Sequence, residues 1–211
     1  MRFAELLATP GVHEESVLRS TFGFMAFHGG NLERVTDDIA RTAAERSGSS
    51  YYGVIQDYPL REHLPSIEVS TRSSPVLAAF VSHVDIVIAI HGFGRDGLWT
   101  TILAGGTNRA LAGIVTQVLT PVLGGYTIVD DLDVIPKELR GMHPQNPVNL
   151  PRFGGVQLEL PPRIRGLTPG AATMERIDGR IMPTNDLINS LVESVRVWQA
   201  QPQSDESPPG R

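Results

Sequence analysis

Two of the six histidines stand in the same sequence context, and that context suits a chemical role. His28 and His91 each end an apolar run, and each is followed at once by glycine. If the two runs are neighbouring strands of an open α/β sheet, both imidazoles lie at its carboxyl edge, where ligands bind in such folds. We expect the glycine after each histidine to let the backbone turn, so that the rings can face a shared cleft.

A carboxylate follows the first of these histidines. Glu33 lies in what we expect to be the first turn of the next helix, close enough to fold back towards the strand end. Two imidazoles and one carboxylate form the three-ligand zinc site of many hydrolases, with the fourth position left for water. The sequence therefore predicts one Zn²⁺ ion held by His28, Glu33 and His91.

A second carboxylate could supply the general base. Glu159 is the lone charged residue in an apolar strand, and burial would raise its pKa towards the range of a proton shuttle. Each residue also has a plainer interpretation. The histidines could be packed core residues, Glu33 could stabilise the positive end of a helix, and Glu159 could point outward from an edge strand. The four positions together favour a metal-dependent hydrolase.

Alternating strands and helices must position these residues. Predicted strands cover 22–28, 51–56, 66–71, 85–91, 99–104, 126–130 and 155–160. Predicted helices cover 32–45, with Asn31 as N-cap and Gly48 as stop, then 75–84, 107–123 and 183–199. This alternation predicts an α/β fold: a three-layer αβα single domain with a mixed, largely parallel sheet. We expect residues 1–200 to form the hydrolase domain and residues 201–211 to form a disordered tail.

Composition excludes several other chemistries. The 211 residues contain no cysteine, and Lys137 is the only lysine against 17 arginines, so thiolate chemistry is ruled out and lysine chemistry would rest on one residue. A net charge of −5 offers no basic field for nucleic acid. The sequence shows neither a signal peptide nor an apolar run long enough for a membrane span, so we predict a cytoplasmic protein without a membrane partner.

Three segments of the chain resemble the signature blocks of the poly-γ-glutamate hydrolase family, a group of small zinc peptidases with a zinc-carboxypeptidase-like fold that includes phage enzymes. They occur in the family's order and with similar spacing, at residues 27–33, 88–92 and 154–160. The resemblance runs from about residue 22 to residue 166. It implies His28, Glu33 and His91 as zinc ligands and Glu159 as general base.

The resemblance also implies that Arg165 belongs to the catalytic site. Two prolines, Pro161 and Pro162, stand where the family has one small or polar residue, so Arg163 is a rival for the same role. Asn149 and the turn that contains Arg109 resemble family positions more loosely.

The chemistry of the expected substrate independently favours arginine. A substrate that carries carboxylates needs a planar donor fork, which arginine provides and lysine does not. Five arginines follow predicted strands, and we expect at most two of them to contact substrate: Arg95, Arg109, Arg152, Arg163 and Arg165. As substrate-binding candidates we take Arg163, Asn149, Arg152 and Arg109.

We therefore predict a zinc-dependent hydrolase that cleaves amide bonds in a small-molecule or peptide substrate carrying carboxylates. The resemblance implies γ-glutamyl linkages. Two alternatives stay open: a metal-assisted ester or phosphoester hydrolase that uses the same ligands, and a non-catalytic module that binds an anion or a metal. The natural substrate, endo- versus exo-cleavage and the oligomeric state do not follow from the sequence.

Overall fold

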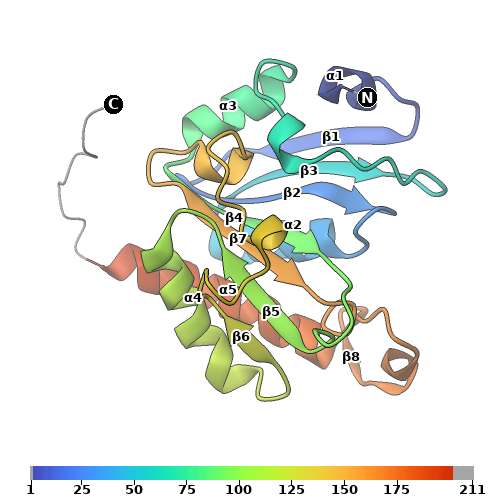
Figure 1. Cartoon of the computed structure of the whole chain (residues 1–211), viewed down its shortest axis with the longest axis vertical. Coiled ribbons are helices and arrows are strands. Elements are labelled where there is room, and N and C mark those ends of the chain that lie inside the picture. Colours follow the sequence, from blue (N-terminus) through green and yellow to red (C-terminus); the bar gives the residue numbers. More distant parts are fainter. Residues whose placement is uncertain (1, 202–211) are drawn as a thin grey trace.

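The described residues, 2–201 of a computed structural model, form a seven-stranded sheet (Figure 1). Its strands are β1 (Val12–Val17), β2 (Phe22–Gly30), β3 (Ser50–Gln56), β4 (Ile86–Gly92), β5 (Thr101–Gly105), β6 (Thr127–Val129) and β7 (Gly155–Leu160). They lie in the order β1-β3-β2-β4-β7-β5-β6. The central strands β3, β2, β4 and β7 are parallel, whereas β1 runs antiparallel to β3, and β5 runs antiparallel to β7 but parallel to β6. The predicted mixed, largely parallel sheet is confirmed.

Helices cover both faces of this sheet. They are α1 (Phe3–Leu7), α2 (Thr36–Ser47), α3 (Pro75–His83), α4 (Arg109–Val122) and α5 (Met182–Ala200). Helices α2, α4 and α5 contribute to one core cluster, and α1 and α3 contribute to the other. Figure 1 shows α4 beside α5, and α1 and α3 on the side of β1 and β3. The result is the three-layer αβα arrangement that the sequence predicts.

The strands at the centre are mostly apolar on both faces, because both of their faces are buried. In β2, Phe24 and Ala26 pack into the core under α2, α4 and α5, while the alternate residues Met25 and Phe27 pack into the opposite core. Successive side chains of a strand point to opposite faces, so a continuous apolar run is what a doubly covered strand requires.

The short segments between these elements include a two-stranded hairpin and four 3₁₀ turns. The hairpin joins β8 (Arg176–Ile177) and β9 (Arg180–Ile181), and the turns are η1 (Ser66–Glu68), η2 (Lys137–Leu139), η3 (Pro147–Asn149) and η4 (Pro169–Thr173). The strand predicted over 66–71 is wrong, because η1 and a turn occupy this stretch on the surface. Its single buried apolar residue, Val69, is too little to hold a strand in the sheet.

The helix after His28 begins later than predicted. Helix α2 starts at Thr36 with Val35 as its N-cap, and Val35 adopts a left-handed φ of 78°. Asn31 is not the cap, since its side-chain amide donates instead to the carbonyl of Leu60. The predicted stop at Gly48 is confirmed, because this residue caps α2 with a φ of 68°.

Two N-terminal elements, α1 and β1, were not predicted. β1 is an edge strand that contains His13, Glu14 and Glu15, and these polar residues hide its alternation. It is held by pairing with β3 and by a hydrogen bond of 2.6 Å from the Tyr52 hydroxyl to Glu14. None of the helices in the described chain is long and apolar enough to cross a membrane. The predicted tail lies outside the described residues apart from Gln201.

Candidate active site

Adjacent parallel strands bring the candidate residues to one edge of the sheet. β2, β4 and β7 are neighbours, and His91 of β4 pairs in register with Glu159 of β7. In β7, Gln157 and Glu159 point away from the core that holds the alternate residues Val156 and Leu158. The side chains at the carboxyl ends of these strands therefore face the α1 and α3 side of the sheet.

The carboxylate of Glu33 lies between the two histidines. One oxygen, Oε1, is 2.9 Å from Nδ1 of His28, and the other, Oε2, is 3.4 Å from Nδ1 of His91. The backbone N–H of Gly92 also donates to Oε2, at 2.8 Å. One donor atom from each of the three residues lies within 4.8 Å of the others, so the three form a group that could hold a metal ion.

The local backbone explains how Glu33 reaches this position. The pairing of β2 with β3 shifts register between Ala26 and Gly29, which is where His28 stands. The chain then turns back, and the N–H of Glu33 donates to the carbonyl of His28 at 2.9 Å. A helix that began directly after the strand would carry Glu33 away, so the late start of α2 is part of the site.

The hydrogen bonding of His28 tests whether a cation fits here. Its Nε2 lies 2.8 Å from the carbonyl of Leu64, which can only accept, so Nε2 carries a hydrogen. In the neutral ring the lone pair is then on Nδ1, where it faces the carboxylate of Glu33. Two acceptors that face each other require a proton or a metal between them. A second imidazole completes a donor set that suits zinc, and the carbonyl behind His28 orients its ring as in known metal sites.

Burial and charge shift the pKa values of the cluster in opposite directions. Burial alone would raise the pKa of Glu33, but the imidazoles of His91 and His28 outweigh it and hold this pKa far below its usual range. Burial lowers the pKa of His91, yet the Glu33 carboxylate raises it above the ordinary value. The low pKa keeps the Glu33 carboxylate ionised, which is the form in which a carboxylate can bind a metal ion.

Glu159 is buried beside the triad and is held by one hydrogen bond. The amide Nε2 of Gln157 donates to its Oε1 at 2.7 Å, and Nδ2 of Asn146 donates to Oε1 of Gln157 at 2.8 Å. No described residue donates to the other oxygen, Oε2, which leaves it available for a proton. Burial raises the pKa of Glu159 above its ordinary value, and His91 only partly offsets this.

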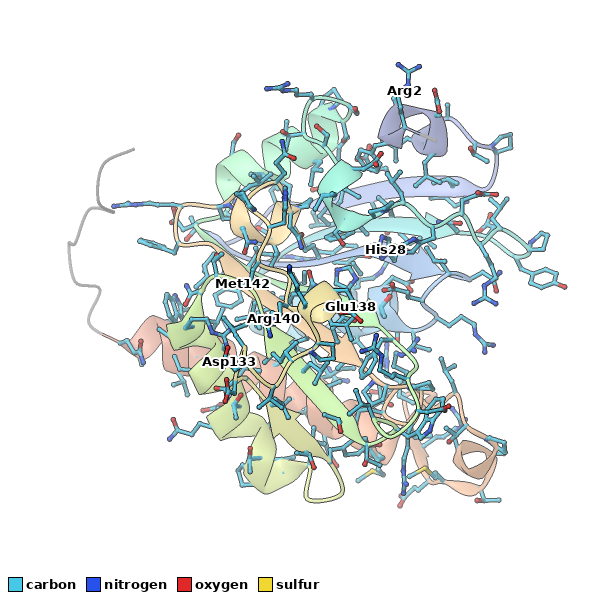
Figure 2. The ribbon with its side chains drawn as sticks, in the orientation of Figure 1. Arg2, His28, Asp133, Glu138, Arg140 and Met142 are labelled. Atoms are coloured by element: carbon cyan, nitrogen blue, oxygen red, sulfur yellow. The ribbon has the colours of Figure 1, made fainter. Side chains whose placement is uncertain are left out.

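The triad and Glu159 open into one cavity of about 940 Å³. That volume lies within the range of pockets that bind small ligands. Much of its wall is formed by the segment 132–146, and its other lining residues include His63, Ile67 and Phe93. In Figure 2 the labelled Glu138, Arg140 and Met142 of this segment stand on the same side of His28. The cavity therefore gives a ligand access to the carboxylate and imidazole groups.

Arg165, predicted as catalytic, lies behind the site and does not line this cavity. Its buried guanidinium donates to the carbonyls of Leu160 at 3.2 Å, Arg34 at 2.9 Å and Phe93 at 3.5 Å. These carbonyls belong to the segments that follow Glu159, Glu33 and His91. The geometry is that of a positioning residue, which ties together the three segments that carry the site.

The four predicted substrate-binding residues also lie outside the cavity lining in the described chain. Arg109 donates to the carbonyls of Gly106 and Ala104, and Arg152 stacks 4.9 Å from the ring centroid of Phe153.

Asn149 supports a loop. It accepts from Thr107 and donates to the carbonyls of Gly141 and His143. Arg163 is exposed next to Trp99 and Met174, in a separate depression. Their predicted contact with substrate stays a prediction.

Three residues of the site were missed in the sequence. Gln157 shares a strand face with Glu159, and its position two residues away was a usable signal. His63, whose ring centroid is 5.1 Å from that of His28, and Arg140 both come from loops. Loops carry no periodicity, so no pattern could have placed these two side chains at the cavity.

The fold and the site define a class: an α/β protein with a His–Glu–His group at the carboxyl edge of its parallel strands. Within this class, the sequence model of the family described as poly-gamma-glutamate hydrolase matches residues 3–178. The chain therefore belongs to that family, which is a family of hydrolases. No curated protein matches the chain.

Two solved structures share the fold. A bacteriophage poly-gamma-glutamate hydrolase is 20% identical, with a TM-score of 0.75 over 90% of each chain. The zinc-free apo form of YNDL is 19% identical, with a TM-score of 0.67 over 90% of this chain and 89% of the other. At these identities the likeness establishes the arrangement of the elements, so the chemistry must be argued from this chain's own residues.

Proposed function

We propose that this chain is a zinc-dependent amide hydrolase that acts on γ-glutamyl linkages. The observation that carries the proposal is the position of the Glu33 carboxylate between Nδ1 of His28 and Nδ1 of His91. Family membership supports a γ-glutamyl substrate, and the zinc-free form of a structural relative supports zinc as the metal. His28, Glu33 and His91 would hold the ion. When bound there, zinc would polarise a carbonyl and lower the pKa of water to about 7.

Glu159 moves the proton in this proposal. Its Oε2 takes a proton from the attacking water as the water oxygen forms a bond to the amide carbonyl carbon. The same carboxyl group then gives that proton to the amide nitrogen as the C–N bond breaks. The raised pKa of Glu159 suits both steps, because a carboxylate with a raised pKa is a stronger base and can later return the proton as an acid.

Gln157 keeps this carboxylate in position. Its amide holds Oε1 of Glu159, while Asn146 holds the amide of Gln157 in turn. Oε1 is therefore held in place, and Oε2 is the oxygen that can accept a proton from a water molecule. Such fixed geometry is worth much in catalysis, because a misplaced base loses most of its effect.

The test separates metal binding from proton transfer. We expect the zinc-loaded protein to hydrolyse γ-linked oligoglutamate and a chelator to abolish this activity. Glu159→Gln should lower turnover by about 10²- to 10⁴-fold while zinc content stays at one ion per chain. Unchanged turnover in this variant would refute the role of Glu159. A protein that takes up no zinc would refute the proposal as a whole.

A further inference from the structure

Arg140 is the arginine with free donors inside the active-site cavity. It lines the same cavity as His28, Glu33, His91 and Glu159. Its side chain is half-buried, and Nε donates to the carbonyl of Ile135 at 2.9 Å. A guanidinium has five N–H donors, so four remain on the two terminal nitrogens. Within residues 2–201 these four meet neither a hydrogen-bond acceptor nor a carboxylate within ion-pair distance.

The other partly or fully buried arginines differ in this respect. The guanidinium of Arg165 is used by three carbonyls, and that of Arg109 by carbonyls at the start of α4. Arg180 makes a two-pronged pair with Asp38, and Arg41 pairs with Glu15. Of these five arginines in the described chain, Arg140 alone has two terminal nitrogens without a partner, and it is the one that lines the cavity. A charged donor that is partly desolvated and lacks a partner is suited to a ligand anion.

The backbone of Arg140 is fixed to the end of β5. Its carbonyl accepts from the N–H of Gly106 at 2.7 Å. At Gly105 a Cβ atom would lie 2.2 Å from this same carbonyl oxygen, so only glycine permits the approach. The predicted turn after the fifth strand thus anchors the part of the cavity wall that contains Arg140. A side chain on an anchored backbone loses less freedom when it binds a ligand.

The charge of the cavity as a whole does not select an anion. Asp133 and Glu138 line it together with Lys137, and Glu138 already pairs with Arg95. Recognition of a carboxylate must therefore be local. Lys137 is exposed and offers a point charge, whereas the guanidinium of Arg140 matches both oxygens of a carboxylate.

We infer that Arg140 binds a free α-carboxylate of the substrate and makes the site selective for γ-linked chains. This inference rests on the proposed function. A γ-linked glutamyl chain carries its free α-carboxylate directly on the carbon next to the amide nitrogen, whereas an α-linked chain carries its free carboxylate at the end of a two-carbon side chain. A residue bound with its amide at Glu159 can place its α-carboxylate at Arg140, which lines the same cavity. The role is specificity-determining and involves no covalent step.

The experiment compares two substrates across matched variants. The substrates are γ-linked oligoglutamate and the same oligomer with its α-carboxylates converted to carboxamides. The variants are Arg140→Gln and Arg140→Lys, with Arg196→Gln as control, because Arg196 is exposed on α5 and does not line the cavity. Zinc content and thermal unfolding are measured for each protein.

We expect Arg140→Gln to lower kcat/KM for the carboxylate substrate by about 10- to 100-fold and to leave the carboxamide substrate within about twofold. Arg140→Lys should fall between wild type and Arg140→Gln, and Arg196→Gln should match wild type. An equal loss for both substrates, or no loss for either, overturns the inference. If Arg140→Gln does not fold, the ratio of the two substrates in Arg140→Lys decides the question.

A binding measurement separates this inference from the proposed function. Calorimetric titration of γ-linked oligoglutamate into the wild-type protein and into the Arg140 variants requires no turnover. If wild type binds the oligomer but hydrolyses nothing, the proposed function fails, and a tenfold or larger loss of affinity in Arg140→Gln still supports the inference. If wild type does not bind the oligomer, the inference is overturned as well.

Discussion

Gly92 lies directly against the guanidinium of Arg165. A Cβ atom at this glycine would stand 2.6 Å from Cζ of the arginine, a distance at which one of the two must shift. The sequence predicts that Gly92 supplies a sharp turn after His91. Its φ is not in the left-handed region, and the structure shows that the absence of a side chain is what matters. Gly92 leaves space for the guanidinium of Arg165, which joins three segments of the site by hydrogen bonds.

Replacing Gly92 by alanine should therefore disturb the site through Arg165. We expect the free energy of unfolding to fall by about 1–3 kcal/mol, as for other overpacked positions, and zinc to be lost more readily on dialysis. Gly94→Ala is the matched control, because a Cβ there would meet its nearest neighbour at an ordinary 3.7 Å. Denaturant unfolding and metal analysis would measure both effects. Equal behaviour of the two variants would contradict this account of Gly92.

The central part of the fold and the site could be predicted because one physical rule governs both. In parallel strands buried on both faces, a charged or metal-binding side chain costs free energy to bury, so it is expected only at the end of a strand or where a function requires it. His91 and Glu159 interrupt such strands at the same edge, and their register pairing follows from the neighbouring positions of β4 and β7.

The positions of the loops could not be predicted in the same way. Whether Arg109, Arg163 or Arg140 faces the cavity depends on long-range contacts of irregular backbone, and a sequence shows no period for these. Arg109 follows a strand, as a ligand-binding residue would, yet its guanidinium serves backbone carbonyls. Arg140 lies in a proline-rich loop whose sequence contains no pattern that indicates a binding role.

The hydrogen bond from Gln157 to Glu159 should affect the pH dependence of activity. A hydrogen bond to the carboxylate favours its charged form and lowers the pKa of Glu159, partly offsetting the effect of burial. Gln157→Leu removes the donor, so this pKa rises further and the base is protonated over a wider acidic range. The acidic limb of the kcat/KM profile should then move to higher pH, by up to about one unit.

The comparison for this prediction is Gln145→Leu, which changes an exposed glutamine in the loop before β7 whose side chain makes no hydrogen bond to Glu159. Its profile should coincide with that of wild type. An acidic limb that stays in place, or moves to lower pH, in Gln157→Leu would show that Glu159 is not the titrating base.

Substitution can distinguish the proposed metal ligands from their neighbour His63. His63 lines the cavity, and its ring lies 5.1 Å from that of His28, but it does not belong to the group that could share one ion. We expect His28→Ala and His91→Ala to lose stoichiometric zinc after gel filtration, since two remaining donors hold zinc weakly. His63→Ala should retain it. For wild type, zinc at 100 times its Kd should stabilise the fold by about 2.7 kcal/mol, and neither ligand variant should show this gain. Loss of zinc from His63→Ala alone, with His28→Ala and His91→Ala still loaded, would contradict the His28–Glu33–His91 site and place the metal at His63.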